Sequence, residues 1–152
     1  MPSAPLSVRA ELVDRDKKFC AGKADLEVYN LVCECDFGSF SFPIRVAIPK
    51  KDTPVPAFVH INFRPEVPDK YQPTEEIIDA GYAVLSFCYN EVTSDNGDFT
   101  DGLAGLVYPE GKRDPDSCGK IGLWAWAAMR VLDYALTLDS IDPSRISVTG
   151  QR

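Results

Sequence analysis

The sequence predicts a protein of the α/β class, with a parallel sheet built from alternating strands and helices. Two compact apolar runs, residues 57–63 and 82–88, flank a short segment that carries the start and stop signals of a helix. A longer amphipathic stretch, residues 121–138, leads into a third β-branched run at 145–149. Strand, helix and strand in this order form a βαβ unit with a right-handed crossover, which fixes the fold class.

The composition fits one globular domain with a hydrophobic core. The 152 residues are 45% hydrophobic and carry a formal net charge of -7 with a single histidine. We expect one domain spanning residues 1–152, with no nucleic-acid or membrane partner, because no basic stripe is present to contact phosphates. Residues 1–8 lack a positively charged start followed by an apolar stretch, so we expect a cytoplasmic protein. We expect no cofactor.

An antiparallel hairpin opens the regular part of the sequence. Residues 24–35 alternate loosely between polar and apolar side chains and are rich in leucine, valine and tyrosine. Residues 36–39 supply turn-forming side chains, and residues 40–48 resume the extended pattern. The segment 49–56, with its prolines and lysines, is expected to be the loop that ends this hairpin.

The predicted βαβ unit follows directly. The run at 57–63 is bounded by prolines and reads as a strand buried on both faces. The helix at 73–81 begins with proline, places Glu75 and Glu76 beside the positive end of its dipole, and ends on glycine. Residues 82–88 form the second continuous apolar strand.

A long irregular loop is expected at 89–117, because aspartate, glycine and proline recur throughout it. A loop of this length is usually functional or disordered. The helix at 121–138 follows, with apolar residues at helical spacing. Trp124 and Trp126 lie two residues apart on this helix and face different directions. They therefore cannot form one flat sugar-stacking platform, and at least one is expected in the core.

The strand at 145–149 leads into a turn that, in one class of hydrolases, carries the nucleophile. In that class the motif GxSxG bends sharply between a strand and a helix and lifts a serine hydroxyl above the sheet. Gly150 fits the first glycine and Gln151 the variable position, but Arg152 stands where the serine belongs. We therefore assign no catalytic residue and interpret Gly150 as the remnant of a nucleophile elbow.

His60 is the single histidine and thus the one ordinary proton carrier near neutral pH. It lies inside the strand at 57–63, on the same face as Phe58 and Asn62, which favours a hydrogen-bonded structural role. In the hydrolase order the triad histidine follows the nucleophile, whereas His60 precedes Gly150.

Neither the acidic residues nor the cysteines favour a metal site or a disulfide framework. Asp95, Asp98 and Asp101 recur at every third position, but no glutamate closes the calcium-loop pattern, so a solvated loop is favoured. The five cysteines are odd in number and include no CxxC pair. Cys33 and Cys35 share one face if their segment is a strand, and we expect buried or half-buried reduced thiols.

Asn62, Phe63 and Arg64 lie at the end of the first buried strand. Hydrolases of this architecture contribute a backbone N–H to the oxyanion hole from this position. Arg64 can in addition bind a carboxylate. We take these three residues as oxyanion-loop candidates, with a merely solvated Arg64 as the alternative.

Several stretches together make the chain resemble the bacterial glucuronoyl esterase and acetyl xylan esterase group of α/β-hydrolases. Their order and approximate spacing agree as well, over residues 40–150. The matching stretches are FVHINF at 58–63, EEIIDAGYAV at 75–84, GLWAWA at 122–127 with LDY at 132–134, and DPSRISVTG at 142–150.

The resemblance implies a single truncated α/β-hydrolase domain, from the hairpin to the nucleophile elbow. It also implies a serine nucleophile, an arginine directly after it, and a later acid and histidine, none of which maps onto this sequence. The chain is therefore expected to be an inactive N-terminal fragment of an enzyme that cleaves carboxylic esters on plant cell-wall sugars. The open edge of its last strand is expected to promote self-association.

Two alternatives remain. A non-catalytic carbohydrate-binding module would keep the loop at 89–117 and an aromatic surface for sugar contact. A flavodoxin-like or other doubly wound fold also contains βαβ units, although the opening hairpin and the long irregular segment fit the hydrolase order better.

Overall fold

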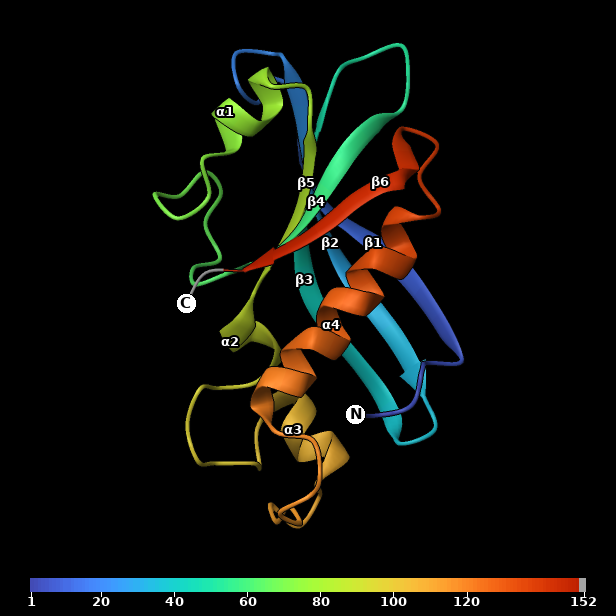
Figure 1. Cartoon of the computed structure of the whole chain (residues 1–152), viewed down its shortest axis with the longest axis vertical. Coiled ribbons are helices and arrows are strands. Elements are labelled where there is room, and N and C mark those ends of the chain that lie inside the picture. The colour runs from blue at the N-terminus through green and yellow to red at the C-terminus, as the bar shows by residue number, and fades with distance from the viewer. Residues whose placement is uncertain (151–152) are drawn as a thin grey trace.

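A mixed sheet of six strands forms the centre of the structure, a computed structural model that describes residues 1–150 (Figure 1). The strands are β1 (Ser7–Asp16), β2 (Ala24–Cys35), β3 (Gly38–Pro49), β4 (Val55–Asn62), β5 (Ala83–Cys88) and β6 (Ile141–Gly150). They lie in the order β1-β2-β3-β5-β4-β6. β1, β2, β3 and β5 pair antiparallel, whereas β5, β4 and β6 run parallel, so the predicted α/β class is confirmed.

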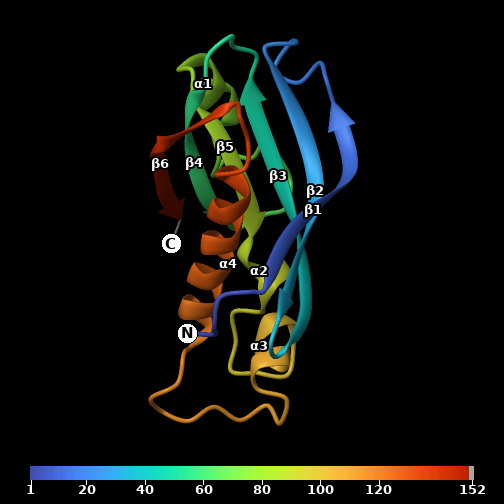
Figure 2. The ribbon, with the colours of Figure 1, turned by 90° about the vertical axis from the view of Figure 1, so that its right-hand side faces the viewer.

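Helices cover both faces of the sheet. They are α1 (Thr74–Asp79), α2 (Tyr89–Val92), α3 (Gly102–Val107) and α4 (Lys120–Ala135). Figure 2 shows α4 in front of β4 and β5, with α1 behind the sheet. The two helices lie on opposite faces because β4→α1→β5 and β5→α4→β6 cross the sheet in opposite directions with the same right-handed sense.

The predicted hairpin is confirmed, and one strand is added to it. β2 and β3 pair over their full length, with Cys35 opposite Gly38, so a two-residue turn joins them. Gly38 has φ 126°, a backbone conformation that favours glycine. The sequence does not predict β1, which pairs with β2 as the outer strand and exposes most of its side chains. The antiparallel strands distinguish this sheet from an all-parallel doubly wound one.

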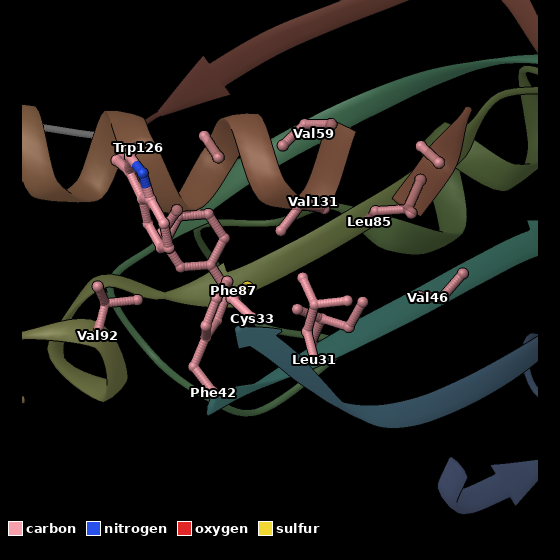
Figure 3. Packing of buried hydrophobic residues seen from close by; sticks show 14 of the residues in the cluster. Leu31, Cys33, Phe42, Val46, Val59, Leu85, Phe87, Val92, Trp126 and Val131 are labelled. Carbon is pink, nitrogen blue, oxygen red and sulfur yellow. The ribbon is translucent and has the colours of Figure 1, made fainter. Parts of the chain in front are cut away.

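The main core lies between α4 and the sheet (Figure 3). Trp126 is fully buried there, and its indole N–H donates to the Ser3 carbonyl oxygen at 2.9 Å. Phe42 and Phe87 pack edge to face with ring centroids 5.5 Å apart. The expectation that at least one tryptophan lies in the core is therefore confirmed. A smaller cluster around Ile78 fills the α1 side.

The expectation of an irregular segment at 89–117 is wrong in two places. α2 begins directly after β5, and α3 spans Gly102–Val107. Both helices are too short to carry an amphipathic period, which is why the sequence pattern does not show them. Gly102 has φ 52°, and a Cβ there would lie 2.2 Å from the Val92 carbonyl oxygen, so only glycine allows this close approach.

β6 forms one edge of the described sheet, and β1 forms the other. β6 is longer than the predicted strand at 145–149, and it pairs only with β4 among the described strands. Val148 on this strand is 56% exposed, as expected for an uncovered hydrophobic edge. Within residues 1–150, no helix is long and apolar enough to cross a membrane.

Candidate functional site

A cavity of about 570 Å³ opens at the carboxyl edge of the parallel strands. Ligands of α/β proteins bind outside this edge, because loops from several strands converge there. The cavity is lined by Ile61, Asn62, Phe63, Tyr89, Asp95, Ile121, Trp124, Ala125 and Gly150. These residues come from the end of β4, from α2 and the loop after it, from the start of α4, and from the end of β6.

Aromatic rings form one wall of the cavity. The ring centroids of Phe63 and Tyr89 lie 5.6 Å apart, and those of Tyr89 and Trp124 lie 5.2 Å apart, both edge to face. The Trp124 indole N–H donates to the Thr93 carbonyl oxygen at 3.1 Å. Edge-to-face packing and this hydrogen bond fix the rings, so the wall is preformed for an apolar or sugar-ring surface.

Asn62, which ends β4, and Phe63, directly after it, line the cavity. The Phe63 backbone N–H donates to the Asn62 side-chain oxygen at 2.9 Å. The Asn62 side-chain nitrogen lies 3.4 Å from the Gln72 side-chain oxygen, and Gln72 in turn donates to Thr74 at 3.2 Å. The Phe63 N–H can therefore donate to an oxyanion only if the Asn62 oxygen moves away. This role stays a prediction.

Arg64 lies apart from the other two oxyanion-loop candidates. Its guanidinium is 3.9 Å from an Asp69 carboxylate oxygen and 5.4 Å from the centre of the Tyr71 ring. It does not belong to the cavity lining given above. The structure thus brings Asn62, Phe63 and Gly150 together at one opening and places Arg64 beside it.

Gly150 ends β6 at the mouth of the cavity. It pairs with Ile61 of β4, so the end of β6 and the end of β4 meet at the same level. This is the place where a strand-to-helix elbow would present a side chain to the cavity. Gln151 and Arg152, which occupy the next two elbow positions in the sequence, lie outside the described residues.

His60 lies on the other face of the sheet. It alternates with Val59 and Ile61, which face the α4 side, and its Nδ1 lies 2.9 Å from the Thr149 hydroxyl oxygen. Burial lowers the pKa of the imidazole from its ordinary value. The structural role predicted for His60 is consistent with this position. Within the described lining, no serine, cysteine or histidine faces the cavity.

Lys120 organises the acidic loop beside the cavity. Its ammonium group contacts the Ser94 hydroxyl oxygen at 3.3 Å, an Asp101 carboxylate oxygen at 3.2 Å and the Asp98 carbonyl oxygen. Burial opposes the shift, but hydrogen bonds from Ser94 and Lys120 hold the pKa of Asp101 below its ordinary value. The Lys120 ammonium group therefore occupies the oxygen-lined centre of this loop.

The acidic loop is largely solvated, as the sequence indicates. Asp95 and Asp98 are exposed, with Asp95 at the rim of the cavity, and Asp101 is half-buried and held by Lys120. Within residues 1–150, no group of three histidine, cysteine, aspartate or glutamate side chains is arranged to hold a metal ion.

Two cavity features are missed by reasoning from the sequence. Tyr89 falls in a segment read as irregular, although its place directly after a buried strand is a signal for a site residue. The contacts of Lys120 with the acidic loop span 19 to 26 residues of sequence, and no local pattern reveals them.

Solved structures with this fold are known from several bacteria. A CE15 glucuronoyl esterase from Teredinibacter turnerae superimposes with a TM-score of 0.79 at 23% identity, covering 99% of this chain and 41% of its own. A glucuronoyl esterase from Solibacter usitatus gives a TM-score of 0.81 at 19% identity, covering 99% of this chain and 47% of its own. A Bacteroides fragilis protein provisionally assigned as an acetyl xylan esterase gives 0.59 at 19% identity, covering 97% and 42%.

These comparisons place the chain within part of a larger fold. The chain spans less than half the length of each of these solved structures. No curated protein sequence matches it. The sequence profile of the family described as "Glucuronyl esterase, fungi" matches residues 33–151, which is most of the chain. The chain therefore belongs to the glucuronyl esterase family.

Proposed function

We propose that this chain supplies the substrate-facing strand edge of a carboxylic ester hydrolase that acts on plant cell-wall carbohydrate esters, of the glucuronoyl or acetyl xylan type. The observation that carries the proposal is the convergence of the β4 end, the aromatic wall and the β6 end on one cavity. An apolar wall with a few polar groups fits a sugar ring that bears an ester.

We further propose that these 152 residues alone do not turn over an ester. Acyl transfer by a serine enzyme needs a nucleophile and a base within hydrogen-bond reach of each other. The single histidine is buried on the opposite face of the sheet, and the described cavity lining holds no serine. We therefore expect this chain, an N-terminal fragment of the enzyme, to bind the substrate without cleaving it.

The test compares turnover and binding in the same preparation. Nitrophenyl acetate and a benzyl glucuronate ester serve as substrates, and tryptophan emission reports binding, because Trp124 lies in the cavity wall. We expect no turnover above buffer and a saturable emission change with the glucuronate ester. Tyr89→Ala should weaken that binding, whereas Tyr82→Ala, a tyrosine that packs on Phe58 away from the cavity, should not.

Two results would count against the proposal. Turnover by the 152-residue chain would overturn the inactivity. Equal binding of esterified and unesterified xylan fragments, each sensitive to Tyr89→Ala, would instead favour a carbohydrate-binding module.

We also propose that the isolated chain self-associates through the free edge of β6. An unpaired strand edge with an exposed valine is a template for pairing with another chain. Light scattering at modest concentration measures this. Val148→Lys should increase the monomer fraction. Val13→Lys on β1, the other edge strand, should have a smaller effect although Val13 is 66% exposed, because the charged residues 14–16 that follow it already disfavour pairing.

A further inference from the structure

A row of polar side chains lies beside the cavity and crosses from β6 over β4 to the start of α1. Four of its five members are buried, with His60 8% exposed and the other three 1% or less. Burial of a polar group is unfavourable unless the group is hydrogen-bonded, so each buried donor and acceptor in the row needs a partner. In order along the row, the residues are Thr149, His60, Asn62, Gln72 and Thr74.

Gln72 anchors the amide nitrogen of Asn62. The Asn62 Nδ2 donates to the Gln72 side-chain oxygen at 3.4 Å, and the Gln72 amide nitrogen donates to the Thr74 hydroxyl oxygen at 3.2 Å. The Thr74 hydroxyl closes the chain by donating to the Gln72 backbone carbonyl oxygen at 3.2 Å. The Asn62 oxygen Oδ1 points to another partner, the Phe63 backbone N–H, at 2.9 Å. Oδ1 is therefore the part of Asn62 that can change its partner while Gln72 holds the nitrogen.

The other half of the row leaves one nitrogen of His60 unpaired. Its Nδ1 lies 2.9 Å from the Thr149 hydroxyl oxygen, whereas Nε2 is buried with no hydrogen-bond partner among residues 1–150. When Thr149 donates to Nδ1, the neutral ring carries its proton on Nε2. Nε2–H is then a buried donor without an acceptor, which is unfavourable. An arrangement that brings an oxygen to Nε2 would remove this cost.

Asn62 is the neighbour that can supply this oxygen. Side chains two residues apart on a strand lie on the same face, so Asn62 follows His60 along one face of β4. Burial lowers the pKa of His60, and the Asn62 side chain opposes this shift, which places it close to the ring. Two donors therefore compete for one oxygen. Oδ1 holds the Phe63 N–H and leaves Nε2 without a partner.

We propose that Asn62 is a positioning residue whose side-chain oxygen moves between the Phe63 N–H and the His60 Nε2–H, a change that we call the Asn62 switch. In the substrate-free chain the oxygen covers the Phe63 N–H. When an ester enters the cavity, its carbonyl oxygen accepts from the Phe63 N–H, and the Asn62 oxygen turns to Nε2. The inference rests on the proposed function, because it assigns the Phe63 N–H to the ester carbonyl.

The Asn62 switch favours the ester-bound state. Before binding, the Phe63 N–H is paired and the Nε2–H is not. After binding, the ester oxygen pairs with the first donor and the Asn62 oxygen with the second. The partner that His60 gains offsets the cost of uncovering the Phe63 N–H, so no buried donor stays unpaired. His60 thus acts on the cavity through Asn62, without touching the substrate.

The first test needs no ligand and uses NMR of the 152-residue chain at neutral pH. The nitrogen chemical shifts of the imidazole show which ring nitrogen carries the proton. We expect the proton of the neutral His60 ring on Nε2. A ring that carries it on Nδ1 would overturn the proposal, because Nε2 would then have no hydrogen to donate to Asn62.

The second test measures amide hydrogen exchange of Phe63 in matched variants. His60→Phe removes the competing donor, so the Asn62 oxygen stays on the Phe63 N–H and exchange should slow about fivefold. His60→Gln keeps an N–H donor at about the reach of Nε2 and should restore most of the wild-type rate. Ser86→Ala, buried on β5 in register with His60, should leave the rate unchanged. An unaltered rate in His60→Phe, or equal slowing in Ser86→Ala, would contradict the Asn62 switch.

The third test titrates the benzyl glucuronate ester into the wild type, and it decides the matter if His60→Phe fails to fold. The Phe63 amide and the His60 Nε2 signals should shift together, with the same apparent Kd as the Trp124 emission. In folded His60→Phe the Kd should rise about tenfold, because the uncovered state is less populated.

The outcomes of the titration separate the Asn62 switch from the proposed function. An ester that changes the Trp124 emission but leaves the His60 Nε2 signal in place refutes the switch, and the proposed function stands. An ester that causes no emission change contradicts the proposed function. In that case the proton position on His60 and the exchange rates of the Phe63 amide still decide whether the Asn62 oxygen changes its partner.

Discussion

His60 and Thr149 meet across the β4–β6 pair, with the imidazole Nδ1 2.9 Å from the threonine hydroxyl oxygen. The second ring nitrogen, Nε2, is buried with no hydrogen-bond partner within the described residues. Burial of the ring disfavours its charged form and lowers its pKa. His60 is therefore a neutral group of the sheet interior, and its titration reports on folding.

The folded chain should become less stable as the pH falls and His60 is protonated. Because the folded-state pKa lies below the ordinary value of 6.5, the unfolded chain binds a proton that the folded chain does not when the pH falls below that value. The free energy of unfolding therefore falls with decreasing pH in this window. Urea denaturation of the wild type and His60→Asn at about pH 7.5 and 5.5 measures this. The difference in free energy of unfolding between the wild type and His60→Asn should be smaller at the lower pH. A difference that does not change with pH would contradict the assignment of His60 as a buried neutral group.

Trp126 should be the most costly aromatic residue to truncate. It is fully buried, donates to Ser3 and packs 6.2 Å from the Phe37 ring. Trp126→Ala should lower the free energy of unfolding by about 3–5 kcal/mol, because it leaves a cavity in the core. Ile121→Ala, at a site that is 78% exposed, should change it by less than about 0.5 kcal/mol. Equal losses in urea denaturation would show that α4 is not oriented as described.

Lys120→Met should loosen the acidic loop without disturbing the sheet. Loss of the ammonium removes the contacts to Ser94, Asp98 and Asp101, and charge-assisted hydrogen bonds contribute about 1.5–3 kcal/mol each. Amide exchange of residues 94–101 should therefore accelerate, while that of β2 and β3 stays unchanged. Lys120→Arg keeps the charge and should restore part of the protection. Unaltered exchange in the loop of the methionine variant would refute the role of this contact.

The cysteines should differ in reactivity according to burial. All five are free, and Cys33, Cys35 and Cys88 are buried. Burial raises the pKa of Cys33 to about 12, so the reactive thiolate is scarce at neutral pH. In the folded chain a maleimide should modify Cys20 and Cys118 first, and the buried three only in urea. Mass spectrometry after timed quenching checks the order, and early modification of Cys33 would place β2 outside the core.

Elements with a strong local period are predictable from this sequence, and those held by tertiary contacts are not. β2, β3, β4, α1, β5 and α4 carry alternation, capping signals or apolar runs that specify them. β1 is a mostly exposed outer strand that is stabilised by pairing with β2. The alternation of Val8, Ala10 and Leu12 with Arg9 and Glu11 is a strand signal, but it covers only the first half of the element. α2 and α3 depend on the packing of the segment between β5 and α4, which no window of the sequence reveals.

The candidate site is predictable where it follows a strand. Asn62, Phe63 and Gly150 come directly after or at the end of β4 and β6, and the carboxyl edge of a parallel sheet brings such residues together. The direction of the Arg64 side chain is set by Asp69 and Tyr71, through a turn whose shape the sequence does not specify. The pairing of Trp124 with Tyr89 likewise depends on how α2 meets α4.

The ammonium of Lys120 has a consequence for how the cavity mouth keeps its shape. In calcium-binding loops the neutralising charge is recruited from solution and is lost when the ion is chelated or diluted. Here the neutralising charge is the Lys120 ammonium, which is covalently part of α4. It stays beside Asp101 whatever ions the solution contains. The conformation of the acidic loop at the cavity mouth therefore depends on folding alone. Dialysis or EDTA should leave it unchanged.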